Sequence, residues 1–234
     1  MYTSYVLAPA PRTALPVHGS TDRFAVRRIY CIGRNYADHV REMGGDPARE
    51  PPIFFSKPSD AIAGAGGLVP YPPGTTNLHH EVELVVALQR GGAQIAPQEA
   101  LQHVWGYAVG NDLTRRDLQG QARAKGLPWD MAKGFDASAQ IGALTPAAQF
   151  GAPEAQAIWL KVNGQERQRS TLDQMIWPVA EIIAALSQLV TLQAGDLIFT
   201  GTPEGVSALS PGDEVTAGID GLEPLDFRIG PGPA

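Results

Sequence analysis

Two glutamates separated by one residue, Glu81 and Glu83 in HHEVELVVAL, open a run that otherwise has the composition of a buried strand. Alternate side chains of a strand share a face, so the two carboxylates point the same way from the edge of an apolar segment. Like charges are costly there, and one acid would tend to keep its proton. A hard divalent cation removes that cost, because Mg²⁺ or Mn²⁺ prefers carboxylate and water oxygens. The alternative is a strand end with two solvated acids.

A third acid, Asp112, follows the apolar stretch 104–110, which is predicted to be a strand. Three carboxylates from two strand ends would form an oxygen-rich site that leaves positions for water and substrate. The His79–His80 pair precedes Glu81 and could hydrogen-bond the ligands. Asn111–Asp112 is also an ordinary turn signal, so a plain turn is the alternative.

His39 and Glu42 lie three residues apart on a helix predicted for Asn35–Met43, so their side chains are neighbours. A glutamate beside a histidine can fix its tautomer and raise its basicity, which suits a general base acting on water. Glycines at Gly33 and Gly44–Gly45 flank this helix and could act as hinges of a lid. The alternative is an exposed pair on a small surface helix.

Lys133, in WDMAKGFDAS, has Ala132 and Gly134 as neighbours, which give it little side-chain cover. Its ammonium group could therefore reach a cavity and stabilise an oxyanion. A solvated loop lysine is the alternative.

The segment Thr200–Gly205, TGTPEG, follows a predicted strand at Asp196–Thr200. Its backbone N–H groups and the Thr202 hydroxyl could hold a carboxylate, as nests of amides do. A simple Gly/Pro turn is the alternative. The sequence contains no phosphate-binding loop and no Gly-x-Ser-x-Gly elbow of a serine hydrolase.

The elements that must position these residues are mostly short strands, which do not alternate regularly with helices. Residues 1–26 are expected to form an N-terminal arm with one strand at Ser4–Leu7, and residues 27–234 the catalytic domain. Further strands are predicted at Arg28–Ile32, Ile53–Ser56, Glu81–Leu88, Trp105–Gly110 and Glu214–Ala217. A hairpin is also predicted, in which a primed turn at Asn163–Gly164 joins the strands Trp159–Val162 and Gln165–Ser170. This pattern predicts an α+β fold, a mixed and largely antiparallel β-sheet roll with short helices.

Helices are predicted from their capping signals and their apolar periodicity. Asn35 is expected to cap the first helix, and Thr114 to cap another with Asp117 three residues later. The other two helices are predicted at Pro97–His103 and Pro178–Leu189.

Composition narrows the classes of protein that the chain can belong to. The 234 residues carry a net charge of −6 with a pI of about 5.3, so no basic face for nucleic acid is expected. No apolar run is long enough to span a membrane. The single cysteine, Cys31, excludes an intrachain disulfide and fits a reducing, cytoplasmic location. A charged content of only 18% favours much buried surface, including a subunit interface.

From about Arg27 to Ile219 the chain resembles the fumarylacetoacetate hydrolase family. The resemblance is carried by the order and spacing of IYCIGRNYADHVREMG, FFSKPSDAI, HHEVELVVAL, WGYAVGNDLTRRDLQ, DMAKGFD and DLIFTGTPEGV. It implies a sheet roll of the family's C-terminal-domain type, assembled as a homodimer with one divalent cation, Mg²⁺ or Mn²⁺, per subunit. The family's metal ligands fall on Glu81, Glu83 and Asp112.

The resemblance also implies the roles of other side chains. The catalytic lid dyad falls on His39 and Glu42, and the lysine that stabilises the oxyanion falls on Lys133. The substrate-binding positions that it implies are Arg116, Gln119, Gly201, Thr202, Pro203 and the supporting Lys57.

The implied reaction is hydrolysis of a C–C bond in a small 2,4-diketo acid. The stretch FAVRRIYCIGRNYADHVREMGGDPAREPP is similar to bacterial members that convert fumarylpyruvate and water to fumarate and pyruvate in gentisate breakdown. Members with nearly the same metal set decarboxylate oxaloacetate, hydrolyse other acylpyruvates or isomerise hydroxymuconates, and the motifs do not separate these activities. A dimeric metal-binding protein without catalysis is the more distant alternative.

Overall fold

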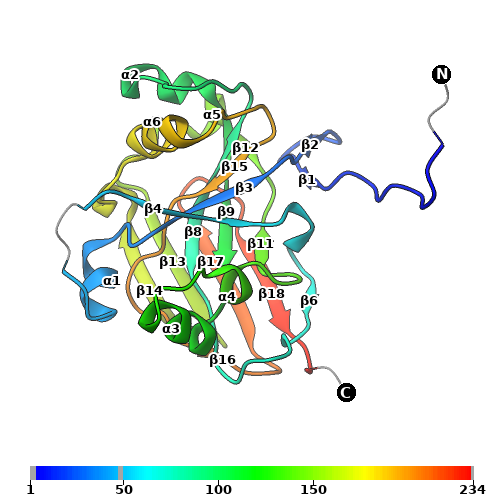
Figure 1. The fold of residues 1–234 in the computed structure, drawn as a ribbon, viewed down its shortest axis with the longest axis vertical. Helices are drawn as coiled ribbons and strands as arrows, with labels where there is room; N and C mark the ends of the chain where they lie inside the picture. The colour runs from blue at the N-terminus through cyan, green and yellow to red at the C-terminus, as the bar shows by residue number, and fades with distance from the viewer. Residues whose placement is uncertain (1–3, 47–49, 233–234) are drawn as a thin grey trace.

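The computed structural model describes residues 4–46 and 50–232 of the chain. Its centre is formed by two large sheets, with short helices at the periphery (Figure 1). Helices α1, at Ala37–Glu42, and α3, at Arg116–Ala124, lie on one side of the molecule, and α6, at Val179–Leu189, lies at another end. Among the described residues, no helix is long and apolar enough to cross a membrane.

The larger sheet carries the site and has eight strands. In spatial order they are β4 (Ile53–Lys57), β3 (Ile29–Gly33), β15 (Leu197–Phe199), β8 (Val82–Leu88), β9 (Val104–Asp112), β11 (Ala139–Ile141) and β5 (Ile62–Gly64), with β12 (Thr145–Pro146) also paired to β9. β3 pairs with β15 in parallel, as β11 does with β5, and the other pairs are antiparallel.

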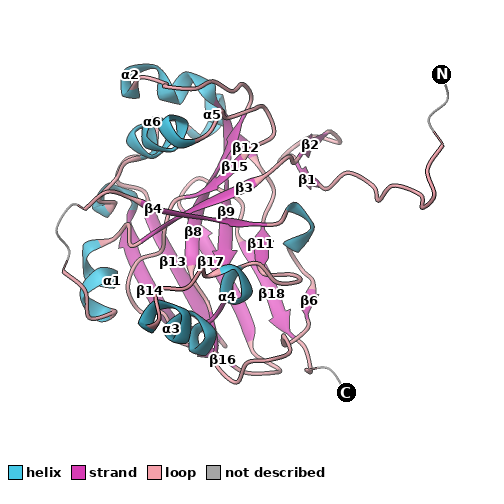
Figure 2. Cartoon of the chain, viewed as in Figure 1, coloured by secondary structure: helices cyan, strands magenta, loops and turns pink. Residues whose placement is uncertain are grey.

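The remaining strands form a five-stranded sheet and two small sheets. The five-stranded sheet has the order β14 (Gln165–Thr171), β13 (Ala157–Val162), β17 (Glu214–Ile219), β18 (Leu225–Ile229) and β6 (Leu68–Val69). The small sheets are β10 (Thr114–Arg115), β7 (Leu78–His79) and β16 (Ala208–Leu209), and the pair β1 (Ala14–Pro16) and β2 (Arg23–Ala25). Strands dominate helices throughout (Figure 2), which confirms the predicted mixed, largely antiparallel α+β fold.

The other helices are short. They are α2 (Pro97–Ala100), α4 (Asp130–Lys133), α5 (Ala147–Phe150) and the 3₁₀ turns η1 (Ser59–Ala61), η2 (Leu101–His103) and η3 (Leu172–Gln174). The helix predicted at Pro97–His103 is therefore α2 followed directly by η2.

Strand β8 is buried on both faces, and each face packs in a different apolar cluster. Leu84 and Val86 belong to the core between the two large sheets, whereas Val85 and Ala87 pack with Cys31 and its neighbours on the other face. Because side chains alternate along a strand, Glu83 shares the face of Val85. The predicted strand is confirmed. Its two acids lie on the face of Val85 and Ala87, at the end of the strand that reaches the site.

The hairpin β13–β14 confirms the predicted primed turn. Asn163 and Gly164 have φ angles of 51° and 77°, and positive values at both central residues are those of a type I′ turn. Asn163 also accepts a hydrogen bond from the Glu214 backbone N–H and donates one to Asp213.

In the N-terminal arm the predicted strand at Ser4–Leu7 is wrong, because these residues have no strand partner. The arm instead forms the hairpin β1–β2, and the residues before it extend away from the body (Figure 1).

Both predicted polar caps are also wrong. Tyr36 and Arg115 occupy the N-cap positions, and neither makes a side-chain capping bond. Asn35 instead bonds to Trp177 and Thr200, and the Thr114 hydroxyl donates to the Asp112 carbonyl. Tertiary hydrogen bonds have replaced local ones at both positions.

Candidate active site

The register between β8 and β9 brings the three predicted acids together. Glu83 lies opposite Gly110, and the Asp112 N–H donates to the Glu81 carbonyl over 2.8 Å. All three side chains therefore project from the same face of the sheet. One oxygen of each carboxylate lies within 4.8 Å of the others, and all three residues are buried.

The chemistry of these donors fits a hard divalent cation. All the ligand atoms are carboxylate oxygens, which is the donor type that Mg²⁺ and Mn²⁺ prefer. Burial and the like charges of Asp112 and Glu81 raise the pKa of Glu83 well above its ordinary value. Glu83 is the acid of the cluster that these like charges affect, and a bound cation would relieve the repulsion.

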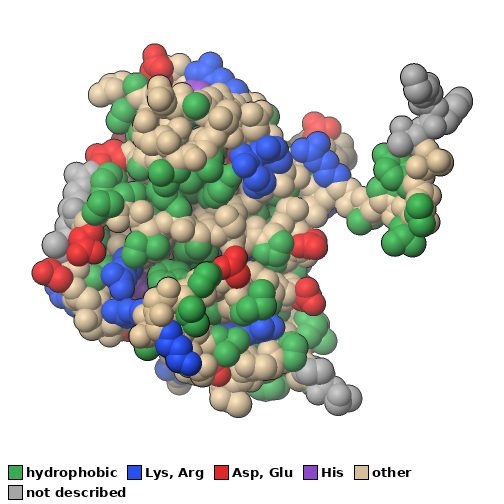
Figure 3. Space-filling view, in the orientation of Figure 1, with side chains coloured by type: hydrophobic (Ala, Val, Ile, Leu, Met, Phe, Trp, Pro, Cys, Tyr) green, Lys and Arg blue, Asp and Glu red, His purple; other side chains and the backbone are tan. Residues whose placement is uncertain are grey.

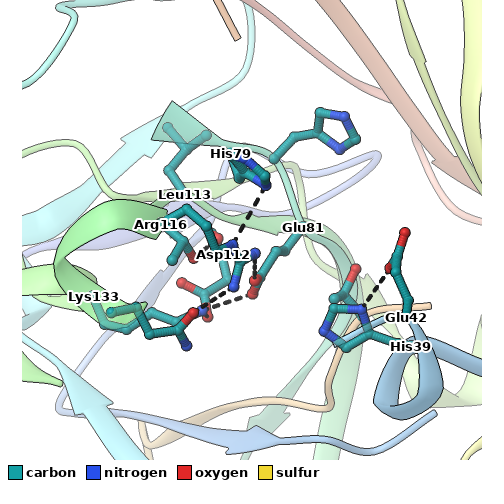
Figure 4. A network of polar contacts seen from close by, with 12 residues as sticks. His39, Glu42, His79, Glu81, Asp112, Leu113, Arg116 and Lys133 are labelled. Carbon is teal, nitrogen blue, oxygen red and sulfur yellow. Dashed lines mark hydrogen bonds and ion pairs between the residues drawn. The ribbon is translucent and has the colours of Figure 1, made fainter. Parts of the chain in front are cut away.

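Lysine and arginine side chains lie directly on the acids (Figure 4). Lys133 Nζ, at the end of α4, donates to Glu81 Oε2 at 2.7 Å and to Asp112 Oδ2 at 2.6 Å. Arg116, at the start of α3, donates to Glu81 and to Gln119. Although burial opposes ionisation of Glu81, Lys133 and Arg116 hold the pKa of Glu81 well below its ordinary range. Burial would lower the pKa of Lys133, but Asp112 and Glu81 outweigh burial and raise it, so the ammonium form is retained.

Lys57, at the end of β4, supports this group from behind. Its Nζ lies 2.7 Å from Asp112 Oδ1 and donates to the carbonyls of Leu113 and Lys133. Lys57 thereby connects the end of β9 to α4 and fixes where Lys133 stands. It does not line the cavity, which agrees with a supporting role.

The two residues of the predicted dyad meet on α1. His39 Nδ1 lies 3.1 Å from Glu42 Oε2, and Glu42 Oε1 accepts the Gly205 N–H at 3.0 Å (Figure 4). Partial burial would raise the pKa of Glu42, but the bonds from His39 and Gly205 outweigh it and lower the pKa. An ionised Glu42 holds the proton of His39 on Nδ1, which leaves Nε2 as the basic nitrogen.

The TGTPEG segment forms a turn beside the acids. The Gly201 N–H donates to Glu83 Oε2 at 2.6 Å, and Gln168 Nε2 donates to Thr202 Oγ1 and to the Pro203 carbonyl, each at 2.8 Å. Because the Thr202 oxygen accepts from Gln168, its hydroxyl proton is free to bind an anion. Of the turn residues Gly201, Thr202 and Pro203, Thr202 is the one that lines the cavity.

Gln168 and Asn111 are site residues that the sequence analysis missed. Gln168 comes from the hairpin strand β14, far from the site in sequence, and its Oε1 accepts from the Val82 N–H. Asn111 Oδ1 accepts the Glu81 N–H at 3.0 Å. Both are buried polar residues inside strands. A polar residue at an apolar strand position was the only feature of the sequence that could have indicated them.

The histidines before Glu81 hold the surrounding loop rather than the acids. His80 bonds to Gln168 and Ser207, and His79 bonds to Asn77 and Arg116. Burial lowers the pKa of both histidines to about 4, so both are neutral near pH 7.

These groups surround a cavity of about 190 Å³. The predicted residues that line it are His39, Glu81, Glu83, Asp112, Arg116, Gln119, Lys133 and Thr202. The other four predicted residues do not line the cavity. They are Glu42, Lys57, Gly201 and Pro203, and each bonds to a residue that lines the cavity or lies directly behind its lining. The structure thus brings all the predicted site residues into one region.

Buried acids beside retained cations, with an acid–base pair on the same cavity, are typical of an enzyme active site. The family model described as Fumarylacetoacetate (FAA) hydrolase C-terminal matches residues 28–230. The chain belongs to the fumarylacetoacetate hydrolase family, which confirms the resemblance seen in the sequence.

Individual relatives point to more than one activity. A crystal structure of fumarylpyruvate hydrolase from Pseudomonas aeruginosa, in complex with Mn²⁺ and pyruvate, is 52% identical with a TM-score of 0.95, covering 97% of this chain and 99% of that one. A Burkholderia cenocepacia structure, provisionally described as a fumarylpyruvate hydrolase, is 55% identical with a TM-score of 0.92, covering 99% and 100%. The mitochondrial oxaloacetate tautomerase FAHD1 of Rattus norvegicus is 45% identical over 203 residues, 87% of this chain and 91% of the relative.

Proposed function

We propose that this enzyme hydrolyses the C3–C4 bond of an acylpyruvate, with fumarylpyruvate as its substrate and fumarate and pyruvate as products. The observation that carries the proposal is that His39, bonded to Glu42, lines the same cavity as the three acids. A water-activating pair is what hydrolysis needs in addition to a site for a keto acid. The likeness to a fumarylpyruvate hydrolase over nearly the whole chain supports the substrate.

Glu81, Glu83 and Asp112 would hold one Mg²⁺ or Mn²⁺ ion, as their donor chemistry supports. The ion, when bound, supplies Lewis-acid polarisation of the 2-oxo acid end of the substrate. Arg116 and Gln119, which line the same cavity, would face the substrate, and the Thr202 hydroxyl would offer a donor to its carboxylate. Gly201 and Pro203 hold the turn that presents Thr202, and Lys57 holds Lys133.

The reaction then uses the side chains of the chain itself. His39 Nε2 takes a proton from water while the oxygen of that water adds to C4. Lys133 stabilises the negative charge that develops on the C4 oxygen. The C3–C4 bond breaks with its electron pair going to C3, and C4 becomes a carboxyl carbon of fumarate. His39 returns its proton to C3, which completes pyruvate, and the ionised Glu42 stabilises the imidazolium in between.

The test is turnover of fumarylpyruvate by the purified enzyme with Mg²⁺ or Mn²⁺, followed by loss of the diketo acid and by identification of both products. Chelation of the ion should stop turnover, and restoring it should recover the rate. Absence of fumarate and pyruvate with either metal would refute the proposal.

A second candidate is oxaloacetate tautomerisation, which the 45% identity to FAHD1 favours. This reaction moves a proton between carbon and oxygen and needs no attacking water. The same assay with oxaloacetate separates the two activities. Because decarboxylation of oxaloacetate also needs no water, release of CO₂ should be measured alongside.

The assembly and the location of the chain remain predictions. We propose a homodimer, which the low charged content of 18% supports because it favours a buried subunit surface. Light scattering after gel filtration tests it, and a monomeric mass would contradict it. The cytoplasmic location is tested by fractionation of the source cells.

A further inference from the structure

Two cavity-lining arginines are not used by the mechanism above. Among the cations of the cavity, Lys133 and Arg116 already pair with acids. Arg34, which follows β3, makes no hydrogen bond or ion pair with any residue of the described part of the chain, although it lines the cavity. Arg123, near the end of α3, donates to the Met43 carbonyl at 3.1 Å and pairs with no carboxylate within the described ranges. Within the described residues, these two arginines of the cavity are thus not ion-paired with an acid, although Arg34 also borders a second hollow that contains Asp46 and Glu50.

Lysine and arginine side chains lie beside a histidine on the surface near α1, and acidic side chains lie close to them (Figure 3). His39, Arg34 and Arg123 all line the cavity. An anion in the cavity therefore meets basic side chains as well as the three acids.

The backbone of Arg34 is held in an unfavourable conformation. Its φ angle is 60°, in the left-handed region that residues other than glycine, asparagine and aspartate avoid. The next residue fixes it there, because the Asn35 amide donates to Thr200 at 2.8 Å and to Trp177 at 3.0 Å and accepts from the Trp177 N–H at 2.7 Å. Retained strain of this kind clusters at ligand-binding and catalytic sites.

We propose that Arg34, assisted by Arg123, binds a second carboxylate of the substrate, at the end of the acyl group remote from the keto acid. This inference rests on the proposed acylpyruvate hydrolysis and assigns its substrate class, dicarboxylic acylpyruvates. A guanidinium group binds a carboxylate through two parallel hydrogen bonds, which suits a planar acid such as the fumaryl end. Arg116 is less suited to this role, since Glu81 neutralises its charge and Glu81, Gln119 and His79 accept three of its five N–H groups.

The test compares two substrates with the same reacting end. Fumarylpyruvate carries the remote carboxylate, and acetylpyruvate lacks it. Arg34→Asn removes the charge while keeping a residue that tolerates the left-handed backbone. We expect the ratio of kcat/KM for fumarylpyruvate to that for acetylpyruvate to fall about 10- to 100-fold, the size of a lost hydrogen bond to a charged group. Arg123→Gln should lower the same ratio, by less.

The matched control is Arg41→Gln, which removes an arginine from the neighbouring helix α1. Arg41 is exposed and pairs with Asp38 outside the cavity, so this variant should keep the wild-type ratio. If Arg34 only shapes the lid hinge, Arg34→Asn will slow both substrates equally. That result would overturn the proposal.

A binding measurement separates failure of this inference from failure of the proposed hydrolysis. Fumarate and crotonate share a carbon skeleton, but only fumarate has two carboxylates. Calorimetry with the Mg²⁺-loaded protein should show tighter binding of fumarate than of crotonate, and Arg34→Asn should remove the difference. If Arg34→Asn still binds fumarate more tightly than crotonate, the carboxylate site is overturned, even if the enzyme hydrolyses fumarylpyruvate. If the variant binds both acids equally, the carboxylate site is supported, even if the enzyme does not hydrolyse fumarylpyruvate.

Discussion

Gly201 donates its backbone N–H to Glu83 Oε2 over 2.6 Å, and a Cβ atom at Gly201 would lie 2.6 Å from the Cβ of Asn35. Its φ angle is 91°, so the turn needs glycine for conformation and for space. The same short stretch thus orients one acid of the cluster and packs against Asn35, just before α1. A change at Gly201 should therefore reach the metal site as well as stability.

We predict that Gly201→Ala lowers the free energy of unfolding by about 2–4 kcal/mol, because it adds a steric clash to the cost of the left-handed backbone. It should also weaken Mg²⁺ or Mn²⁺ binding, because Glu83 loses its backbone donor. Urea unfolding and calorimetry measure the two effects. The control is Gly212→Ala, where φ is 97° but nothing lies within 4 Å of the added Cβ. Equal losses of stability in both variants, with unchanged metal affinity, would contradict the argument.

A second prediction concerns His39 as the base. His39→Ala should lower kcat for fumarylpyruvate by about 10²- to 10⁴-fold, the usual contribution of a general base. Metal affinity should stay within a few fold, because His39 is not one of the three acids. Steady-state kinetics and calorimetry measure the two quantities. Oxaloacetate decarboxylation should fall less, since it needs no attacking water.

His18→Ala is the control for this variant, because His18 pairs with Glu223 at an exposed position. It should match the wild type in both assays. A His39→Ala enzyme that turns over fumarylpyruvate at the wild-type rate would remove the dyad from the mechanism.

The sequence predicted which acids form the cluster, but it did not define the strand pairing that brings them together. Alternation along a strand places Glu81 and Glu83 on one face whatever the fold. The position of Asp112 depends on the pairing register of β8 with β9, which is set by core packing over the whole sheet. The order of the family's motifs along the chain indicated that Asp112 joins the two glutamates, which local rules could not indicate.

The local rules failed where long-range polar contacts took over. Asn35 and Thr114 have the types and spacing of helix caps, but both hydrogen-bond elsewhere. Gln168 holds Thr202 from a strand that is 34 residues away, and a single sequence contains no rule for such a contact. Register and tertiary hydrogen bonds are the parts of this site that only the folded chain defines.

A third prediction follows from the lowered pKa of Glu42. A carboxyl group whose pKa is lower in the folded state stabilises the fold above its unfolded pKa, near 4.3, and loses this effect as pH falls through the lower folded value. Because Glu42 is about one third exposed, solvent screening limits the effect to a few tenths of a kcal/mol. Glu42→Gln should thus be slightly less stable than the wild type at pH 7, and the difference should disappear as pH falls below the lowered folded pKa.

Urea unfolding of both proteins across this range is the measurement. Kinetics at pH 7 should show a lower kcat in Glu42→Gln, because the imidazolium loses its counter-charge. A stability difference that stays constant from pH 7 to pH 3 would show that Glu42 is not ionised against His39.

The last prediction concerns Glu83, whose pKa is raised well above its ordinary value by burial and by Asp112 and Glu81. Without a metal, Glu83 holds its proton to a higher pH than an ordinary glutamate does, and a ligand must be ionised to bind a cation. Mg²⁺ or Mn²⁺ binding should therefore release protons below the raised pKa. Calorimetry in buffers with different ionisation enthalpies measures that release.

Glu83→Gln provides the matched variant, because glutamine has the shape of a protonated glutamate. It should lose most of its metal affinity and release no proton from this position. Its metal-free stability should equal that of the wild type at low pH and exceed it as pH rises above the unfolded pKa, because the unfolded wild type then ionises Glu83 while the folded state still holds the proton. Unchanged metal affinity in Glu83→Gln would exclude Glu83 as a ligand, and with it the cation site on which the proposed hydrolysis depends.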